Sequence, residues 1–197
     1  MTCILVVCTG NICRSPIAEG ILRDELRRRL GDDAPEVISA GVSGWDGSPP
    51  TPEAVEAANE RGTDISGHVA RRLSRRDVDR ADLILCMAGE HREEVLHAVP
   101  RASEKTFTLK ELVRLLETRP AESGGDLTWT ERVRAANQLR RSGFRGNPND
   151  EGISDPLGLP LESYRAVAWE IDEWVRRLVE GFLGKAPARA GIWDKEP

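Results

Sequence analysis

Two residues near the start of the chain have side chains suited to chemistry on phosphorus. Cys8 and Arg14 stand with five residues between them in the stretch CTGNICRSP. A thiolate is a strong nucleophile, and the planar guanidinium of an arginine holds two oxygens of a phosphate group at once. The pair therefore suits attack of sulfur on phosphorus, giving a phosphocysteine that water then hydrolyses.

The spacing alone does not decide the matter, because a cysteine in an apolar run is usually a small core residue. The context favours chemistry: Gly10 and Asn11 allow unusual backbone angles, and Ser15 followed by Pro16 is typical of a helix start. A zinc site is disfavoured, since the four cysteines lack paired C-x-x-C spacing and the three histidines are scattered. We expect no metal and no cofactor.

The elements on either side of this stretch would position it. Residues 4–7 are apolar and mostly β-branched, which predicts a strand buried on both faces of a parallel sheet. Ser15 is the predicted N-cap of a helix that ends at Gly31. A loop between such a strand and helix faces unpaired N–H groups and the positive end of the helix dipole, which stabilise a phosphate or a thiolate.

The same strand-then-helix order recurs three times. Predicted strands cover residues 37–40, 82–87 and 105–109, and the predicted helices that follow them cover 51–62, 90–98 and 108–116. Repeated units of this kind imply right-handed crossovers. The sequence therefore predicts an α/β three-layer sandwich, in which a four-stranded parallel sheet carries helices on both faces.

The later part of the chain departs from this order. Residues 118–153 are interpreted as an insertion with one helix over 129–140, started by a capping box of Thr128 and Glu131. A long amphipathic helix is predicted over 161–183, and residues 185–197 are expected to form a flexible tail. The length of 197 residues, 39% of them hydrophobic, suits a single domain over residues 1–197.

Composition limits the partners and the compartment. The net charge of -5 argues against a general nucleic-acid binder, and the basic run at 71–76 is interpreted as a solvated helix face. The apolar run at 3–8 is too short for a signal peptide or a membrane span. Four cysteines without an export signal are typical of reduced thiols. We expect a cytoplasmic protein, favoured to be a monomer, with no membrane partner.

The stretch VCTGNICRSPIAEG resembles the phosphate-binding loop of the low-molecular-weight protein tyrosine phosphatases. Further stretches follow in the family's order, and together they cover most of the chain outside 118–153: SAGVSGWDG from Ser39, DISGHVARRL from Asp64, ADLILCM from Ala81, TFTLKEL from Thr106 and DPLGLPLESY from Asp155.

The resemblance implies a role for each matching residue. Cys8 would be the nucleophile, Arg14 the phosphate clamp, and Asp155 the acid that protonates the leaving oxygen and then activates water. Cys13 would protect Cys8 by a reversible disulfide. The phosphate cradle would consist of Thr9, Gly10, Asn11, Ile12, Cys13 and Ser15. The polar network that holds the cradle would consist of Asn11, Ser15, Ser39 and His68. The substrate contacts would be Trp45 and Leu157.

The activity that the resemblance implies is hydrolysis of phosphotyrosine in a phosphorylated protein. Two departures bear on the substrate: Leu157 replaces an aromatic residue common in the family, and Ile12 stands where related arginine phosphatases carry a threonine. A third is Ala88, which replaces a common aspartate. A protein-arginine phosphatase is the alternative. An arsenate reductase coupled to thioredoxin is disfavoured, because no further cysteines follow Cys86, and a non-catalytic phosphate-binding module would need neither thiolate nor acid.

Overall fold

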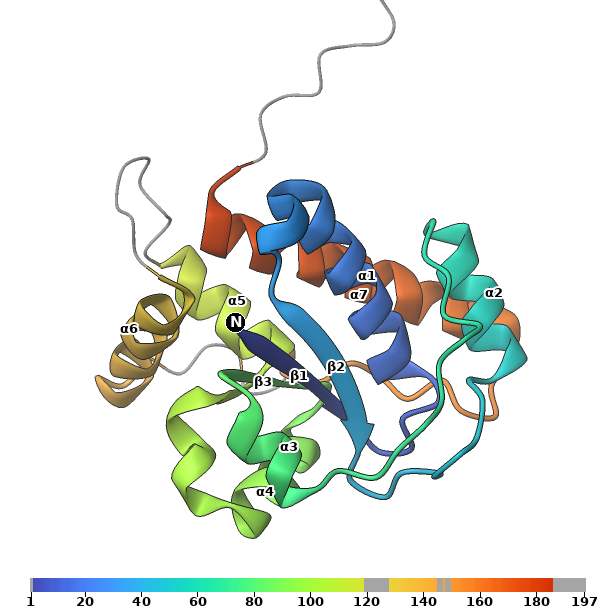
Figure 1. Cartoon of the computed structure of the whole chain (residues 1–197), viewed down its shortest axis with the longest axis horizontal. Helices are drawn as coiled ribbons and strands as arrows, with labels where there is room; N and C mark the ends of the chain where they lie inside the picture. Colours follow the sequence, from blue (N-terminus) through green and yellow to red (C-terminus); the bar gives the residue numbers. More distant parts are fainter. Residues whose placement is uncertain (1, 119–127, 145–146, 148–149, 186–197) are drawn as a thin grey trace, which may run out of the picture.

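A four-stranded parallel sheet forms the centre of the molecule (Figure 1). The structure, a computed structural model, describes residues 2–118, 128–144, 147 and 150–185. The strands lie in the order β2-β1-β3-β4. Their bounds are β1 (Cys3–Cys8), β2 (Glu36–Gly41), β3 (Leu83–Cys86) and β4 (Thr106–Thr108). The predicted α/β sandwich and its four parallel strands are confirmed.

Helices cover both faces of the sheet, and alternate residues of β1 enter two separate cores. Ile4, Val6 and Cys8 point into the larger core, while Leu5 and Val7 point into the smaller one. The larger core is closed by α1 (Arg14–Leu30), α2 (Pro52–Glu60), α5 (Leu109–Glu117), α6 (Trp129–Arg141) and α7 (Leu161–Leu183). The smaller core is closed by α3 (Arg75–Arg80), α4 (Gly89–Ala98) and the 3₁₀ turn η2 (Pro100–Lys105); a second 3₁₀ turn, η1 (Gly31–Asp33), follows α1.

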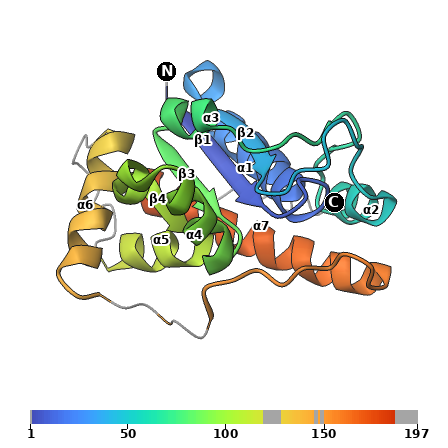
Figure 2. The same ribbon diagram turned by 90° about the horizontal axis from the view of Figure 1, so that it is seen from below.

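The strand register brings several strand ends to one edge. Cys8 pairs with Gly41 of β2, and Val7 pairs with Cys86 of β3. Because the strands are parallel, their carboxyl ends open toward the same loops, which is where open α/β folds bind ligands. Figure 2 shows α2 beside the first half of α7, with α6 at the opposite end of the molecule.

The helix within residues 118–153 is confirmed. Thr128 and Glu131 form the predicted capping box of α6, and each side chain bonds the other residue's backbone N–H. The ring of Trp129 stacks on Phe182 of α7 with 4.2 Å between centroids. Residues 119–127, 145–146 and 148–149 of the expected insertion, and 186–197 of the expected tail, lie outside the described residues.

Two local predictions were wrong. Helix α1 begins at Arg14 with Cys13 as its N-cap, so Ser15 lies inside the first turn and does not cap the helix. The reason is tertiary, because the Ser15 hydroxyl bonds the Cys8 sulfur instead. The basic run at 71–76 is not one helix face, because α3 begins only at Arg75, after its N-cap Ser74. The six residues of α3 are too few to show an apolar period. In the described part of the chain, no helix is both long and apolar enough to cross a membrane.

Candidate active site

The loop between β1 and α1 is shaped by Asn11, which has a φ of 61° in the left-handed region. The Asn11 side-chain amide donates to Ser15 Oγ at 2.9 Å and to Ser39 Oγ at 2.7 Å. Its oxygen accepts the backbone N–H of Arg71 at 2.9 Å, and this donor fixes which way the amide faces. The strained loop is therefore tied to β2 and to the segment before α3.

Directed hydrogen bonds run from this amide to the nucleophile. The amide nitrogen of Asn11 only donates, so Ser15 Oγ accepts from it and keeps its own proton available. Ser15 Oγ lies 2.9 Å from Cys8 Sγ, and when Cys8 is a thiolate the Ser15 hydroxyl is the donor of that bond. The backbone N–H of Asn11 also donates to Cys8 Sγ at 3.3 Å. Two donors at the buried start of a helix stabilise a negative sulfur, which is what a cysteine nucleophile requires.

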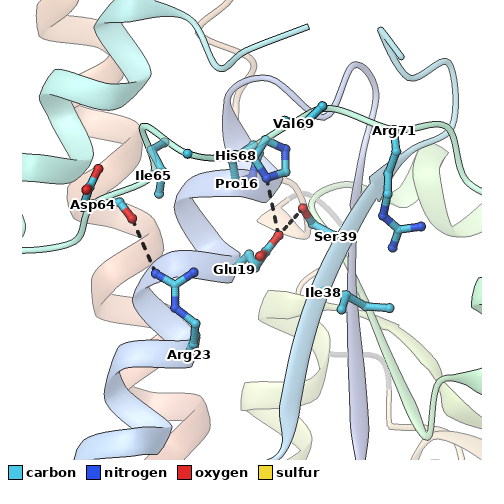
Figure 3. Close-up of a pocket in the computed structure, with 11 residues that line it drawn as sticks. Pro16, Glu19, Arg23, Ile38, Ser39, Asp64, Ile65, His68, Val69 and Arg71 are labelled. Atoms are coloured by element: carbon cyan, nitrogen blue, oxygen red, sulfur yellow. Dashed lines mark hydrogen bonds and ion pairs between the residues drawn. The ribbon is translucent and has the colours of Figure 1, made fainter. Parts of the chain in front are cut away.

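A second layer of polar groups supports the loop from behind. Ser39 Oγ donates to Glu19 Oε2 at 2.6 Å, and His68 Nε2 donates to the Asn11 carbonyl at 3.0 Å. Figure 3 shows the Glu19 carboxylate between Ser39 and His68, with 3.7 Å to His68 Nδ1. These groups border a cavity of about 500 Å³. The structure thus brings together Asn11, Ser15, Ser39 and His68 and adds Glu19, which sequence reasoning missed.

Arg14 is buried at the first position of α1, and its guanidinium has three partners. Nη1 donates to the Ile153 carbonyl at 3.1 Å, and Nη2 donates to Thr9 Oγ1 at 3.1 Å. Nη2 also lies 2.5 Å from Asp155 Oδ2 in an ion pair. The structure therefore places the expected acid, 141 residues away in sequence, directly on the expected phosphate clamp. The other oxygen of Asp155 accepts the N–H of Leu157 at 3.1 Å, which holds the turn.

The mouth of the loop carries exposed apolar side chains. Residue Trp45 is 53% exposed and residue Leu157 is 45% exposed, so neither folds onto the core. The backbone N–H of Trp45 donates to the Gly10 carbonyl at 3.1 Å, which ties this residue to the loop. Gly41 permits the approach of β2, because a Cβ there would lie 2.5 Å from the Thr9 carbonyl oxygen.

The other cysteines differ from Cys8 in their surroundings. Cys13 is buried, with Sγ 3.7 Å from Thr51 Oγ1, and burial raises the pKa of its thiol to about 11. Burial also raises the pKa of Cys86 in β3. All four cysteines are free thiols. A disulfide between Cys8 and Cys13 stays a prediction. The neighbouring Ile12 is buried and packs with the larger core.

Sequence reasoning also missed His91 in the first turn of α4. Its Nε2 lies 2.9 Å from Thr9 Oγ1, and its side chain is fully enclosed. Burial, followed by the charge of Arg14, lowers the pKa of His91 to about 4. The available signal is its position five residues after β3 ends at Cys86, at the sheet edge where parallel strands bring ligand-binding groups together. Among the described residues, no cluster of three or more His, Cys, Asp or Glu side chains is arranged to hold a metal ion.

The fold and this loop define a cysteine-dependent phosphatase. The family profile described as low molecular weight phosphotyrosine protein phosphatase matches residues 3–122, and the chain belongs to this family. The chain is 44% identical over 109 residues to the probable low molecular weight protein-tyrosine-phosphatase EpsP of Ralstonia solanacearum, covering 55% of this chain and 71% of that protein.

Other relatives match along more of the chain. The protein-arginine-phosphatase of Geobacillus stearothermophilus is 32% identical over 177 residues, covering 90% of this chain and 93% of that protein. The solved structure of YwlE arginine phosphatase from the same organism has a TM-score of 0.67 and 31% identity, over 92% of this chain and 93% of the other. A low molecular weight protein tyrosine phosphatase from T. tengcongensis has a TM-score of 0.68 and 35% identity, over 91% and 99%.

Proposed function

We propose that this phosphatase hydrolyses phosphotyrosine in proteins through a phosphocysteine on Cys8. The sulfur attacks phosphorus while the bond to the tyrosine oxygen breaks, and Asp155 gives its proton to that oxygen. Asp155 then takes a proton from a water molecule, whose oxygen attacks phosphorus and releases Cys8 and inorganic phosphate. Arg14 and the backbone N–H groups of residues 9–15 hold the non-bridging oxygens throughout.

The observation that carries this proposal is the meeting of three chemical groups at one loop. Asn11 N–H and the Ser15 hydroxyl face the Cys8 sulfur, and Asp155 lies on Arg14, the side chain that would bind the phosphate. A nucleophile, an oxyanion clamp and a proton donor are the groups that this reaction needs. The Ser15 hydroxyl, 2.9 Å from sulfur, would also stabilise Cys8 as it leaves in the second step.

An aromatic substrate is supported by the mouth of the site. Trp45 is exposed beside Gly10, and Leu157 is exposed next to the Asp155 turn. Apolar side chains on two sides suit a phenyl ring, and a tryptophan offers a flat face for it. Leu157 gives less specific contact than an aromatic residue, so tyrosine selectivity is expected to depend mainly on Trp45.

A protein-arginine phosphatase is the second candidate, favoured by one observation. The arginine phosphatase of Geobacillus stearothermophilus aligns with 90% of this chain, whereas the EpsP alignment covers 55%. Ile12 argues against this candidate. It is a buried, branched residue, whereas the resemblance places a threonine at this position in arginine phosphatases. An Ile12→Thr variant is therefore expected to gain turnover of phosphoarginine relative to phosphotyrosine.

The test compares initial rates on matched phosphotyrosine, phosphoserine and phosphoarginine peptides. Wild type should prefer phosphotyrosine, Cys8→Ser should show no turnover, and Asp155→Asn should lower kcat by about 10²- to 10⁴-fold because a general acid is lost. Asp79→Asn, which removes an exposed carboxylate paired with Arg101, is the matched control. Turnover by Cys8→Ser would overturn the mechanism, and faster turnover of phosphoarginine by wild type would establish the second candidate.

We also propose that the enzyme works in the cytoplasm as a monomer on phosphorylated protein partners. Support for the compartment comes from the four free thiols, since exported proteins usually pair their cysteines. Light scattering of the purified full chain tests the oligomeric state. Fractionation of cells that produce the protein tests the compartment, and recovery in a membrane or secreted fraction would contradict it.

A further inference from the structure

A buried histidine beside the phosphate clamp has no part in the mechanism derived so far. His91 is 1% exposed, and its Nδ1 has no hydrogen-bond partner among the described residues. Its Nε2 lies 2.9 Å from Thr9 Oγ1 and 3.5 Å from Glu90 Oε1. Buried polar side chains are nearly always satisfied, so a half-satisfied one next to a reactive loop calls for an explanation.

Thr9 connects this histidine to the clamp. Arg14 Nη2 can only donate, so the Thr9 hydroxyl oxygen accepts that bond at 3.1 Å. The remaining bond of the hydroxyl is to His91 Nε2, which either donates a proton to Thr9 or accepts one from it. In both tautomers the hydroxyl is held between an imidazole nitrogen and the guanidinium. His91 is therefore one of the two groups that fix the position of the Thr9 oxygen.

The imidazole can occupy this place because it is neutral. Desolvation and the positive charge of Arg14 both disfavour a charged imidazole, whereas Asp155 acts the other way with a smaller effect. A neutral ring supports the hydroxyl without repelling the guanidinium. A lysine or a charged histidine here would oppose the charge that binds phosphate.

We propose that His91 is a positioning residue, which holds the Arg14 guanidinium through Thr9 during catalysis. The inference rests on the proposed function. In the structure Arg14 bonds Asp155, Thr9 and the Ile153 carbonyl. When a phosphate takes its place on the guanidinium and Asp155 turns to acid–base work, the bonds to Thr9 and Ile153 are the ones that the reaction does not use. They keep the planar clamp oriented toward the phosphate.

Two substitutions of similar polarity separate this role from simple packing. The amide of His91→Gln reaches about where Nε2 stands, whereas the amide of His91→Asn reaches only as far as Nδ1. We expect His91→Gln to keep kcat within about 3-fold of wild type, and His91→Asn and Thr9→Val to lose about 10-fold or more, as for one lost hydrogen bond at a charged group. Thr9→Ser, which keeps the hydroxyl, should recover most of the kcat that Thr9→Val loses.

For each variant we would measure kcat and KM on a phosphotyrosine peptide and the affinity for orthovanadate by calorimetry. The melting temperature of each variant is measured as well. The double variant of Thr9→Val and His91→Asn should lose no more than the worse single variant, because both act through one bond. His97→Asn, at the exposed end of the same helix, is the control.

Equal activity and equal orthovanadate affinity of His91→Asn and wild type would overturn the inference, as would fully additive losses. The inference would also be overturned if His91→Gln and His91→Asn lost kcat equally and these losses only paralleled the fall in melting temperature. If His91→Asn does not fold, the Thr9→Val and Thr9→Ser pair still tests whether the Thr9 hydroxyl holds Arg14, and equal activity of Thr9→Val and wild type would overturn the inference. Failure of the proposed function looks different, because wild type itself would then turn over none of the phosphopeptides.

Discussion

Asn11 holds the reactive loop through its backbone and its side chain together. Its φ of 61° is a conformation that asparagine tolerates better than most residues, and its amide bonds Ser15, Ser39 and the Arg71 N–H. These partners come from α1, β2 and the segment before α3. One side chain therefore sets both the curvature of the loop and the direction of the hydroxyl that faces Cys8.

Asn11→Ala should lower the free energy of unfolding by about 2–4 kcal/mol, since a left-handed alanine is strained and buried partners are left unpaired. It should also lower kcat by at least about 10-fold, because the Ser15 hydroxyl is no longer directed. Asn11→Gly relieves only the backbone strain, so it should recover stability without recovering kcat. Urea denaturation and steady-state kinetics test this, with the exposed Asn59→Ala as control. An unchanged kcat in Asn11→Ala would refute the assignment.

His91 should also affect how stability depends on pH. Its pKa is about 4 in the folded protein and near 6.5 when unfolded, so the unfolded chain binds the proton more readily between these values. The free energy of unfolding should therefore fall as pH drops from about 6.5 to about 4, and be unaffected by this group above that window. Urea titrations at about pH 7 and about pH 5 should show a larger fall for wild type than for His91→Gln. Equal falls would contradict the buried, neutral histidine.

At the scale of elements, the segment at residues 150–155 carries Asp155 to the loop. At its start, the two carboxylate oxygens of Asp150 bond Lys110 at 2.5 Å and Arg114 at 2.6 Å, both on α5. Further on, the Ile153 N–H donates to the Met87 carbonyl at 2.7 Å, just after β3. The segment is thus fixed to α5, to the sheet edge and to the loop within six residues.

Asp150→Asn should weaken the anchor on α5, because the amide cannot form two ion pairs, and so let Asp155 move. We expect a loss of about 3- to 10-fold in kcat with a smaller change in KM, since positioning of the acid matters most in the transition state. Glu94→Gln, on the exposed side of α4, is the matched control. Steady-state kinetics on a phosphotyrosine peptide test this role. Equal kcat values for Asp150→Asn and the control would contradict it.

Sequence patterns predicted the elements whose signals are local. The predicted strand in the apolar run of β1 and the predicted capping box of Thr128 and Glu131 are both confirmed. Ser15 was wrongly predicted to be an N-cap. Its hydroxyl bonds Cys8 and Asn11 in the folded loop and therefore does not cap the helix.

The site could be predicted only as far as the family motifs reach. Asp155 was found by resemblance, since nothing local marks it as near Arg14. Glu19, His91 and Asp150 were missed because their roles depend on partners 20, 82 and 40 residues away, respectively, which periodicity does not reveal.

At the scale of the whole molecule, α6 closes the end of the sheet beside β4. Arg140 on α6 donates to the Thr106 carbonyl at 2.9 Å and to the Ser103 carbonyl at 2.5 Å, and its guanidinium lies 4.2 Å from the centre of the Phe107 ring. Burial lowers the pKa of this arginine, and the nearby carboxylate of Glu111 opposes that shift. Helix α6 is therefore fastened to the sheet at the opposite end of the molecule from α2.

Arg140→Met should lower the free energy of unfolding by about 1–3 kcal/mol, because the Thr106 and Ser103 carbonyls lose a donor and Glu111 loses an ion pair. Activity at a temperature well below melting should stay unchanged, since the partners of Arg140 lie on η2, β4, α5 and α6 and none belongs to the loop. Thermal denaturation beside kcat and KM tests this separation, with the exposed Arg134→Met on the same helix as control. A loss of kcat without loss of stability would show that α6 communicates with the site.

The ion pair between Arg14 and Asp155 has a consequence for how the enzyme meets its ligands. A phosphate dianion must displace the carboxylate from the guanidinium, so Asp155 acts as a tethered competitor of substrate and product alike. Asp155→Ala should consequently bind inorganic phosphate more tightly than wild type while turning over far more slowly, which calorimetry can measure. The acid that speeds the reaction would then also hasten product release, and its removal would make the protein a reagent for retaining phosphorylated targets.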